Sequence, residues 1–172
     1  EGSVILSDNG SITFTDVDLN DRPSASDSVK SISLVDSEGN ELVLSAAQHL
    51  VLEEAFSISA DSANPNTGVV NWDYSISESD IDFLNEGDVV TGVFTISVDD
   101  GKGGFVEQDV TITINGTNDT PAIDIVDIAG SIVEGSVILS DNGSITFTDV
   151  DLNDRPSASD SVKSISLVDS EG

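Results

Sequence analysis

The sequence predicts an all-β fold, an antiparallel β-sandwich repeated in tandem units. Apolar and polar residues alternate along most of the chain, as they do in strands with one buried face. Turn-forming residues separate the alternating runs, and only short stretches favour helix. Residues 1–39 recur without substitution as residues 134–172, an offset of 134 − 1 = 133 residues. An offset of that length matches a whole domain, so each repeat is expected to have its own core.

The first third of the repeat predicts two hairpins and a helix. The runs "SVILS" and "GSITFTD" flank Asp8-Asn9-Gly10, a sequence that favours a tight hairpin turn. The runs "VKSISLVD" and "ELVLS" flank residues 37–40 and predict a second hairpin. Ser45 and Gln48 have the spacing of a capping box, which predicts a helix over residues 46–56.

Three later strands are predicted from alternation, with a single helical turn over residues 77–84 before the second of them. In each strand the apolar residues recur at every second position and are expected to face the core. They are Val70, Trp72, Tyr74 and Ile76, then Phe94, Ile96 and Val98, and finally Val110, Ile112 and Ile114.

The stretch "GTNDTP", residues 116–121, breaks the strand pattern and predicts a domain boundary. Residues 1–119 are expected to form one β-sandwich repeat that lacks its first strand, and residues 115–121 to form a linker. Residues 120–172 would be the N-terminal part of the next identical repeat. So short a part of a sandwich cannot bury a core alone, so we expect it to be loosely ordered or to borrow partners. Segment swapping is a related expectation, because 134–172 could replace 1–39.

The charge of the chain is strongly acidic, with 33 Asp and Glu against 5 Lys and Arg and a net charge of −28. Partners that need basic patches, namely nucleic acids and anionic membranes, are therefore not expected. So many like charges destabilise a compact state unless a hydrated surface or bound divalent cations offset them. The chain has no cysteine, so disulfides do not stabilise it. It also lacks an apolar run of about 20 residues, so direct membrane insertion is not expected.

Catalysis is not predicted. The chain has one histidine, His49, inside the expected helix, and no partner residues that would make it a catalytic unit. Carboxylate pairs are so frequent in this sequence that none of them indicates acid–base chemistry. We therefore expect a protein that is not an enzyme.

Carboxylates at strand ends suggest metal binding instead. Asp16 and Asp18 follow a strand in which Ile12 and Phe14 face inward, and "DVDLND" begins like an EF-hand loop. An EF-hand is rejected, because that loop needs glycine where Asp21 stands and glutamate where Asp27 stands, and flanking helices are not predicted.

Two more acidic stretches complete the pattern. Asp99 and Asp100 lie in a glycine-rich turn, and Asn118 and Asp119 lie in the linker. Solvated turns are the alternative interpretation of each stretch alone. Their joint placement at strand ends and in the linker favours cation sites.

Residues 95–123, "TISVDDGKGGFVEQDVTITINGTNDTPAI", resemble the C-terminal signature of the VCBS/cadherin-like repeats of giant RTX-type bacterial surface adhesins. The stretch "GSITFTDVD", residues 10–18, is similar to an early strand of the same family. The resemblance implies an Ig-like fold, neighbouring identical repeats as partners, and Ca2+ bound between repeats. It also implies type I secretion and an extracellular location on the bacterial cell surface.

A more distant resemblance to cadherins implies particular calcium ligands. Asn118 and Asp119, followed by Pro121, stand where cadherins carry their linker motif, and an Asp-x-Asp pair follows 149 − 119 = 30 residues later. Asn115 and Thr120 depart from that motif, which affects the number of ions expected. The full set of metal-ligand candidates is Glu1, Asp16, Asp18, Glu86, Asp99, Asp100, Asn118, Asp119, Asp149 and Asp151.

These observations predict a calcium-stiffened structural extender of a secreted adhesin, which projects a distal region for surface attachment or biofilm formation. One alternative is a carbohydrate- or protein-binding sandwich module, which would need Trp72 and Tyr74 to be exposed. Alternation places both of them in the core. Another alternative is an accessory domain of an exported hydrolase.

Overall fold

The computed structural model describes residues 4–18, 20–60, 66–125, 127–135, 138–151 and 154–168. The chain divides into two compact units. The first contains Glu1–Thr120 together with Val150–Leu152, and the second contains Pro121–Asp149 and Asn153–Gly172.

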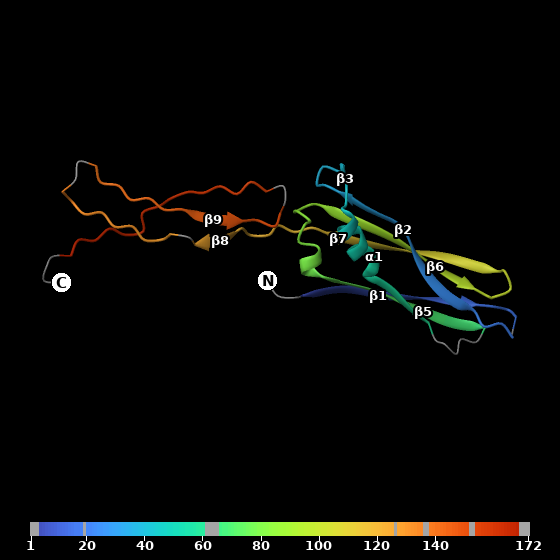
Figure 1. Ribbon diagram of the computed structural model, residues 1–172. Helices are drawn as coiled ribbons and strands as arrows, with labels where there is room; N and C mark the ends of the chain where they lie inside the picture. The colour runs from blue at the N-terminus through green and yellow to red at the C-terminus, as the bar shows by residue number, and fades with distance from the viewer. Residues whose placement is uncertain are drawn as a thin grey trace. The chain divides into compact units, whose positions relative to one another are not determined.

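The first unit is an antiparallel β-sandwich, which confirms the predicted fold class (Figure 1). One sheet has the strand order β1-β5-β4, and its strands are β1 (Ile5–Thr15), β5 (Thr67–Ser77) and β4 (Phe56–Ala60). The other has the order β3-β2-β6-β7, with strands β3 (Glu41–Leu42), β2 (Ser24–Val35), β6 (Val89–Asp99) and β7 (Phe105–Asn115). All of these pairs are antiparallel.

The core lies between the two sheets and is built from the faces that alternation predicts. In β6 every second residue from Val90 to Val98 is buried, and Ile96 is fully inaccessible. The ring of Phe94 stacks on that of Phe56 from the opposite sheet, with centroids 4.3 Å apart. Burial raises the pKa of Tyr74 to about 12, and its hydroxyl donates a hydrogen bond to the carbonyl of Leu52, 3.2 Å away. The faces predicted for the three later strands are confirmed.

The helix α1 (Ala46–Glu54) begins where the capping box predicts. The Ser45 hydroxyl accepts a hydrogen bond from the Gln48 backbone N–H, and the Gln48 side chain accepts one from the Ser45 N–H. The helix ends earlier than predicted, because Phe56 starts β4 and is buried in the core. A 3-10 helix η1 (Glu78–Asp80) occupies the predicted helical turn.

The hairpin predicted at Asp8-Asn9-Gly10 is wrong, because β1 runs straight through these residues. A tight turn of that kind needs a positive φ, and Gly10 does not have one. Gly10 lies opposite Trp72 in the register of β1 and β5. A Cβ at this position would lie 2.6 Å from the Trp72 ring, so the glycine is required by packing. The second predicted hairpin is confirmed, since β2 pairs with β3 across a turn in which Gly39 has φ +86°.

The second unit contains one strand pair, β8 (Ala122–Ile125) with β9 (Ile145–Thr148), in antiparallel register. Among its described residues no apolar side chain is buried. Ile123, Ile145 and Phe147 are about half exposed or more, at 62, 53 and 47%. A lone two-stranded ribbon does not supply a core.

Candidate metal sites

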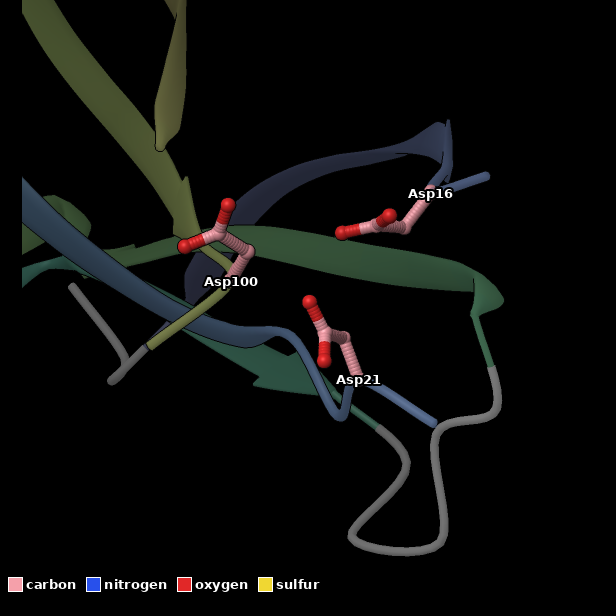
Figure 2. A group of neighbouring side chains, drawn as sticks. All are labelled: Asp16, Asp21 and Asp100. Atoms are coloured by element: carbon pink, nitrogen blue, oxygen red, sulfur yellow. The ribbon is translucent and has the colours of Figure 1, made fainter. Parts of the chain in front are cut away.

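Two aspartates of one loop, Asp16 and Asp21, lie close to the distant Asp100 in the first unit (Figure 2). Asp16 follows β1, Asp21 precedes β2, and Asp100 follows β6. One carboxylate oxygen from each lies within 4.8 Å of the others. We call these three residues the Asp16 group.

Local backbone contacts hold the Asp16 group in place. The Asp16 N–H donates to the Asn66 carbonyl, and the Asn66 amide donates back to the Asp16 carbonyl, at 2.5 and 2.9 Å. The Asp21 N–H donates to the Asp18 carbonyl at 2.9 Å. Hydrogen bonds therefore fix the backbone at Asp16 and at Asp21, the two ends of this loop.

Asp100 is held by the glycine-rich turn that the sequence singles out. Its Oδ1 accepts hydrogen bonds from the backbone N–H groups of Lys102 and Gly104, at 2.6 and 3.0 Å. These bonds hold the pKa of Asp100 below its usual value, so the carboxylate stays ionised. Gly101 and Gly103 have φ +72° and +102°, a backbone region that glycine adopts without strain.

The geometry of the Asp16 group fits a cation. Calcium binds oxygen at about 2.3–2.6 Å, so two of its ligands are at most about 4.6–5.2 Å apart. The three carboxylate oxygens lie within 4.8 Å of one another, so one ion could contact all three. Within the described part of the chain, no lysine or arginine forms an ion pair with these three carboxylates. A cation would therefore offset three like charges that repel one another.

A second acidic group lies in residues 149–154, the repeat equivalent of 16–21. It consists of Asp149, Asp151 and Asp154, again with one oxygen from each within 4.8 Å. Asp151 is only 2% exposed, and its Oδ2 accepts a hydrogen bond from the Asp119 N–H at 2.7 Å. We call these three residues the Asp149 group. The described residues thus include two acidic groups that could hold a metal ion.

Several predicted ligands lie outside both groups. The Asp18 N–H donates to Asp16 Oδ1, and the Asp18 side chain is exposed. Asp99 Oδ1 accepts from the Gly101 N–H, and Glu86 is exposed in the loop before β6.

The two predicted ligands in the linker, Asn118 and Asp119, also form hydrogen bonds. Asn118 donates a hydrogen bond from its amide nitrogen to the Asp119 carbonyl at 2.5 Å. Asp119 contributes its backbone N–H to Asp151. Glu1 lies outside the described residues.

Asp21 and Asp154 were not predicted as ligands. An EF-hand loop has glycine at the position of Asp21, so Asp21 counted only as an argument against that motif. The spacing Asp-x-Asp-x-x-Asp nevertheless makes Asp21 the third carboxylate of one short loop. The same spacing in the second copy marks Asp154.

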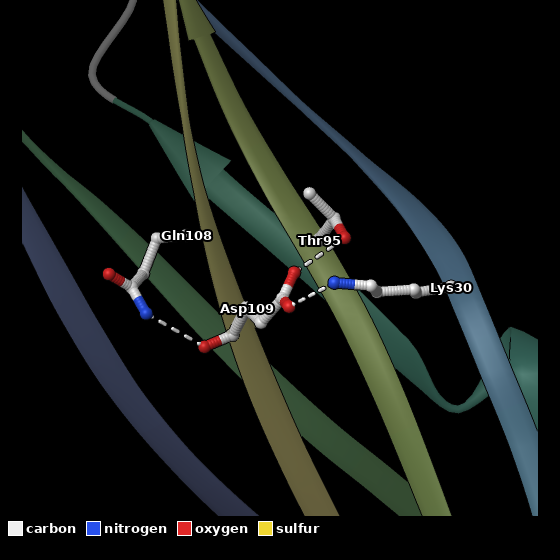
Figure 3. A network of polar contacts seen from close by, with 4 residues as sticks. All are labelled: Lys30, Thr95, Gln108 and Asp109. Atoms are coloured by element: carbon white, nitrogen blue, oxygen red, sulfur yellow. Dashed lines mark hydrogen bonds and ion pairs between the residues drawn. The ribbon is translucent and has the colours of Figure 1, made fainter.

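A separate polar network joins three strands of the larger sheet (Figure 3). Lys30, at an irregularity in the pairing of β2 with β6, donates from Nζ to Asp109 Oδ2 of β7 at 2.5 Å. The Thr95 hydroxyl of β6 donates to Asp109 Oδ1 at 2.8 Å, and Gln108 donates to the Asp109 carbonyl at 3.0 Å. The hydrogen bonds from Lys30 and Thr95 lower the pKa of Asp109, and Asp109 raises that of Lys30.

These shifts predict a pH dependence for the variant Lys30→Met. The Asp109 contribution to stability is present above its unfolded pKa of about 3.9 and is lost as pH falls through the lower folded value. The Lys30 contribution is present below 10.5 and is lost as pH rises through the higher folded value. Urea unfolding should therefore show the variant less stable at pH 7, with a difference from the parent that shrinks as the pH falls below about 3.9. A difference that stays the same as the pH falls would mean that the ion pair contributes nothing.

The remaining sequence candidates have ordinary structural roles. His49 is half exposed on α1, and its Nδ1 lies 3.6 Å from Oε2 of Glu53, one helical turn later. Trp72 packs partly buried against the core, and Tyr74 is buried, as alternation predicts. Within the described residues, no helix has the length and apolar character needed to cross a membrane.

The fold and the two acidic groups define a class, an all-β sandwich protein with two candidate metal sites. No family model, curated protein or solved structure matches the chain.

Proposed function

We propose that this chain is a calcium-binding structural repeat that extends a secreted bacterial surface adhesin. The observation that carries the proposal is the repeated acidic loop. In the first copy Asp16 and Asp21 of this stretch lie with Asp100, and in the second copy Asp149, Asp151 and Asp154 lie together, with oxygens within 4.8 Å in each group. The chain that carries them has a net charge of −28. A divalent cation is the simplest way to offset such a concentration of charge.

The donor set favours calcium over other ions. All six residues offer hard carboxylate oxygens, and neither group includes histidine or cysteine, which softer transition metals prefer. Magnesium keeps several of its waters and is usually bound through one or two carboxylates, whereas each of these groups offers three.

The extender role rests on the repeat and on the linker. A strand of about 10 residues is roughly 33 Å long, so each sandwich adds length to an array. Asp119 of the linker donates to the buried Asp151, which belongs to the first unit although it comes from the second copy. Calcium bound between neighbouring repeats, as the family resemblance implies, would restrict movement of the linker at residues 115–121. The partly buried position of Trp72 gives no support to a sugar-binding role.

Calorimetric titration of the metal-free chain with calcium tests the proposal. We expect saturable binding, and calcium at about 100 times its dissociation constant should add about 2.7 kcal/mol to the free energy of unfolding. Trp72, the single tryptophan, reports the melting of the first unit by fluorescence.

Magnesium chloride and potassium chloride at matched ionic strength are the controls, because salt alone also screens charge repulsion. If calcium raises the melting temperature no more than these salts do, the calcium proposal fails. If calcium binds but small-angle X-ray scattering gives the same radius of gyration with and without chelator, the extender role is wrong. The calcium site itself would still stand.

A further inference from the structure

Strands β1, β5 and β4 form a hollow of about 300 Å³ on the face of their sheet that points away from the core. Gly10, Trp72 and Ile58 lie side by side across the three strands at its centre. Trp72 and Ile58 pack against the core on the other face of the sheet, and glycine has no side chain. Side chains alternate between the two faces of a strand, so the neighbouring positions point outward. The hollow therefore has a floor of backbone and a rim of side chains.

The rim of this hollow is polar and exposed. Its side chains are Asn9, Ser57, Ser59, Asn71 and Asp73. In the strand register Asp73 lies between Asn9 and Ser57, and Asn71 lies opposite Ser59. Within the described part of the chain, none of these five side chains forms a hydrogen bond to another protein group. Two amides, two hydroxyls and one carboxylate can therefore bind a ligand without breaking contacts of the fold.

We propose that this hollow binds a neutral pyranose sugar. Amides and hydroxyls both donate and accept hydrogen bonds and a carboxylate accepts them, which complements sugar hydroxyls that do both. The charge of Asp73 disfavours an anionic ligand, and a single carboxylate is too few for a calcium site. The rim has no apolar side chain that would bind a lipid. The volume lies at the lower end of the range of ligand pockets, about 300–1,000 Å³, which favours one sugar ring.

Hydrogen bonds alone would hold the sugar, because the Trp72 ring packs toward the core and does not stack on a ligand in the hollow. Water competes for such bonds, so a dissociation constant of about 1 mM is expected. A strand paired at the outer edge of β1 would extend the sheet beside the hollow and leave this face open. In an array of the kind proposed above, each repeat would add one hollow, and several weak sites bind a polymeric sugar much more tightly than one.

An NMR titration of the isotope-labelled chain with galactose, glucose, mannose and N-acetylglucosamine tests the site. Each sugar is added up to about 100 mM, two decades above a dissociation constant of about 1 mM. With at least one sugar, the backbone amide signals of Asn9, Asn71 and Asp73 should shift saturably. Signals from the outward face of β2, β6 and β7 should stay unchanged. Chelator is present throughout, so the result is independent of the calcium proposal.

Asn71→Ala removes one hydrogen-bonding side chain from the rim and should raise the dissociation constant by about fivefold. Thr111→Ala is the matched control, because Thr111 is exposed on β7 in the other sheet, and it should leave the dissociation constant unchanged. Trp72 fluorescence verifies that the first unit stays folded in both variants.

The same titration with N-acetyl-lysine amide distinguishes a sugar site from a simple cation site at Asp73. If this cation shifts the signals of the rim and none of the sugars does, the sugar assignment is wrong. Absence of a saturable shift with all four sugars, or equal effects of Asn71→Ala and Thr111→Ala, would also refute the proposal.

Discussion

Replacing Phe94 by alanine is expected to lower the free energy of unfolding of the first unit by about 3–5 kcal/mol. Phe94 is 1% exposed at the centre of the sandwich, and its ring stacks on Phe56 and lies against Tyr74. Its loss would leave a cavity between the two sheets that neither sheet can fill without moving. A domain with an ordinary stability of about 5–15 kcal/mol would lose much of it.

Urea unfolding monitored by Trp72 fluorescence measures this effect, because Trp72 stacks near Phe56 with ring centroids 6.2 Å apart. Phe105→Ala is the matched control. Phe105 is 65% exposed on β7, so its removal should change the free energy of unfolding by about 0.5 kcal/mol or less. Similar losses from the two variants would mean that the core is not centred where the two sheets face each other.

Replacing Asp100 by asparagine is expected to remove most of the stabilisation that calcium adds through the Asp16 group. Asparagine retains one side-chain oxygen, which can still accept the hydrogen bonds from the Lys102 and Gly104 N–H groups. The turn is therefore preserved, while one of the three negative charges is lost. At a calcium concentration about 100 times the parent's dissociation constant, most of the 2.7 kcal/mol gain should disappear.

Asp27→Asn removes the same charge from an exposed position in β2, outside both acidic groups. It should leave the calcium-induced gain intact. In calcium-free buffer both variants should be as stable as the parent or slightly more stable, since each relieves repulsion in a strongly acidic chain. A calcium response that is unchanged in Asp100→Asn would exclude the Asp16 group as the site of binding.

The alternation of residues predicts most of the fold because burial in this sandwich follows strand period closely. Val90 to Val98 in β6 are buried at every second position, and the Ser45–Gln48 capping box alone locates the start of α1. The hairpin prediction at Asn9-Gly10 was wrong because a local preference was overridden by a distant contact. The Trp72 ring occupies the space that a side chain at residue 10 would need.

The sequence predicts that acidic residues form the candidate site, but it predicts less well which residues belong to it. Asp16 follows its strand and Asp100 lies in its glycine-rich turn, and both are visible in the sequence. Their meeting depends on how β1 and β6, from different sheets, are placed across the core, and no local pattern encodes that. The acidic loop contributes Asp16 and Asp21 in the first copy, whereas Asp151, the equivalent of the exposed Asp18, is buried in the second.

The positions of the start of β1 and the end of β7 have a mechanical consequence. Leu6 near the start of β1 and Asn115 at the end of β7 line one pocket, so both strands end on the same side of the sandwich. Because hydrogen bonds between antiparallel strands run across the strands, tension applied at these two points would load them one at a time and peel β1 from β5.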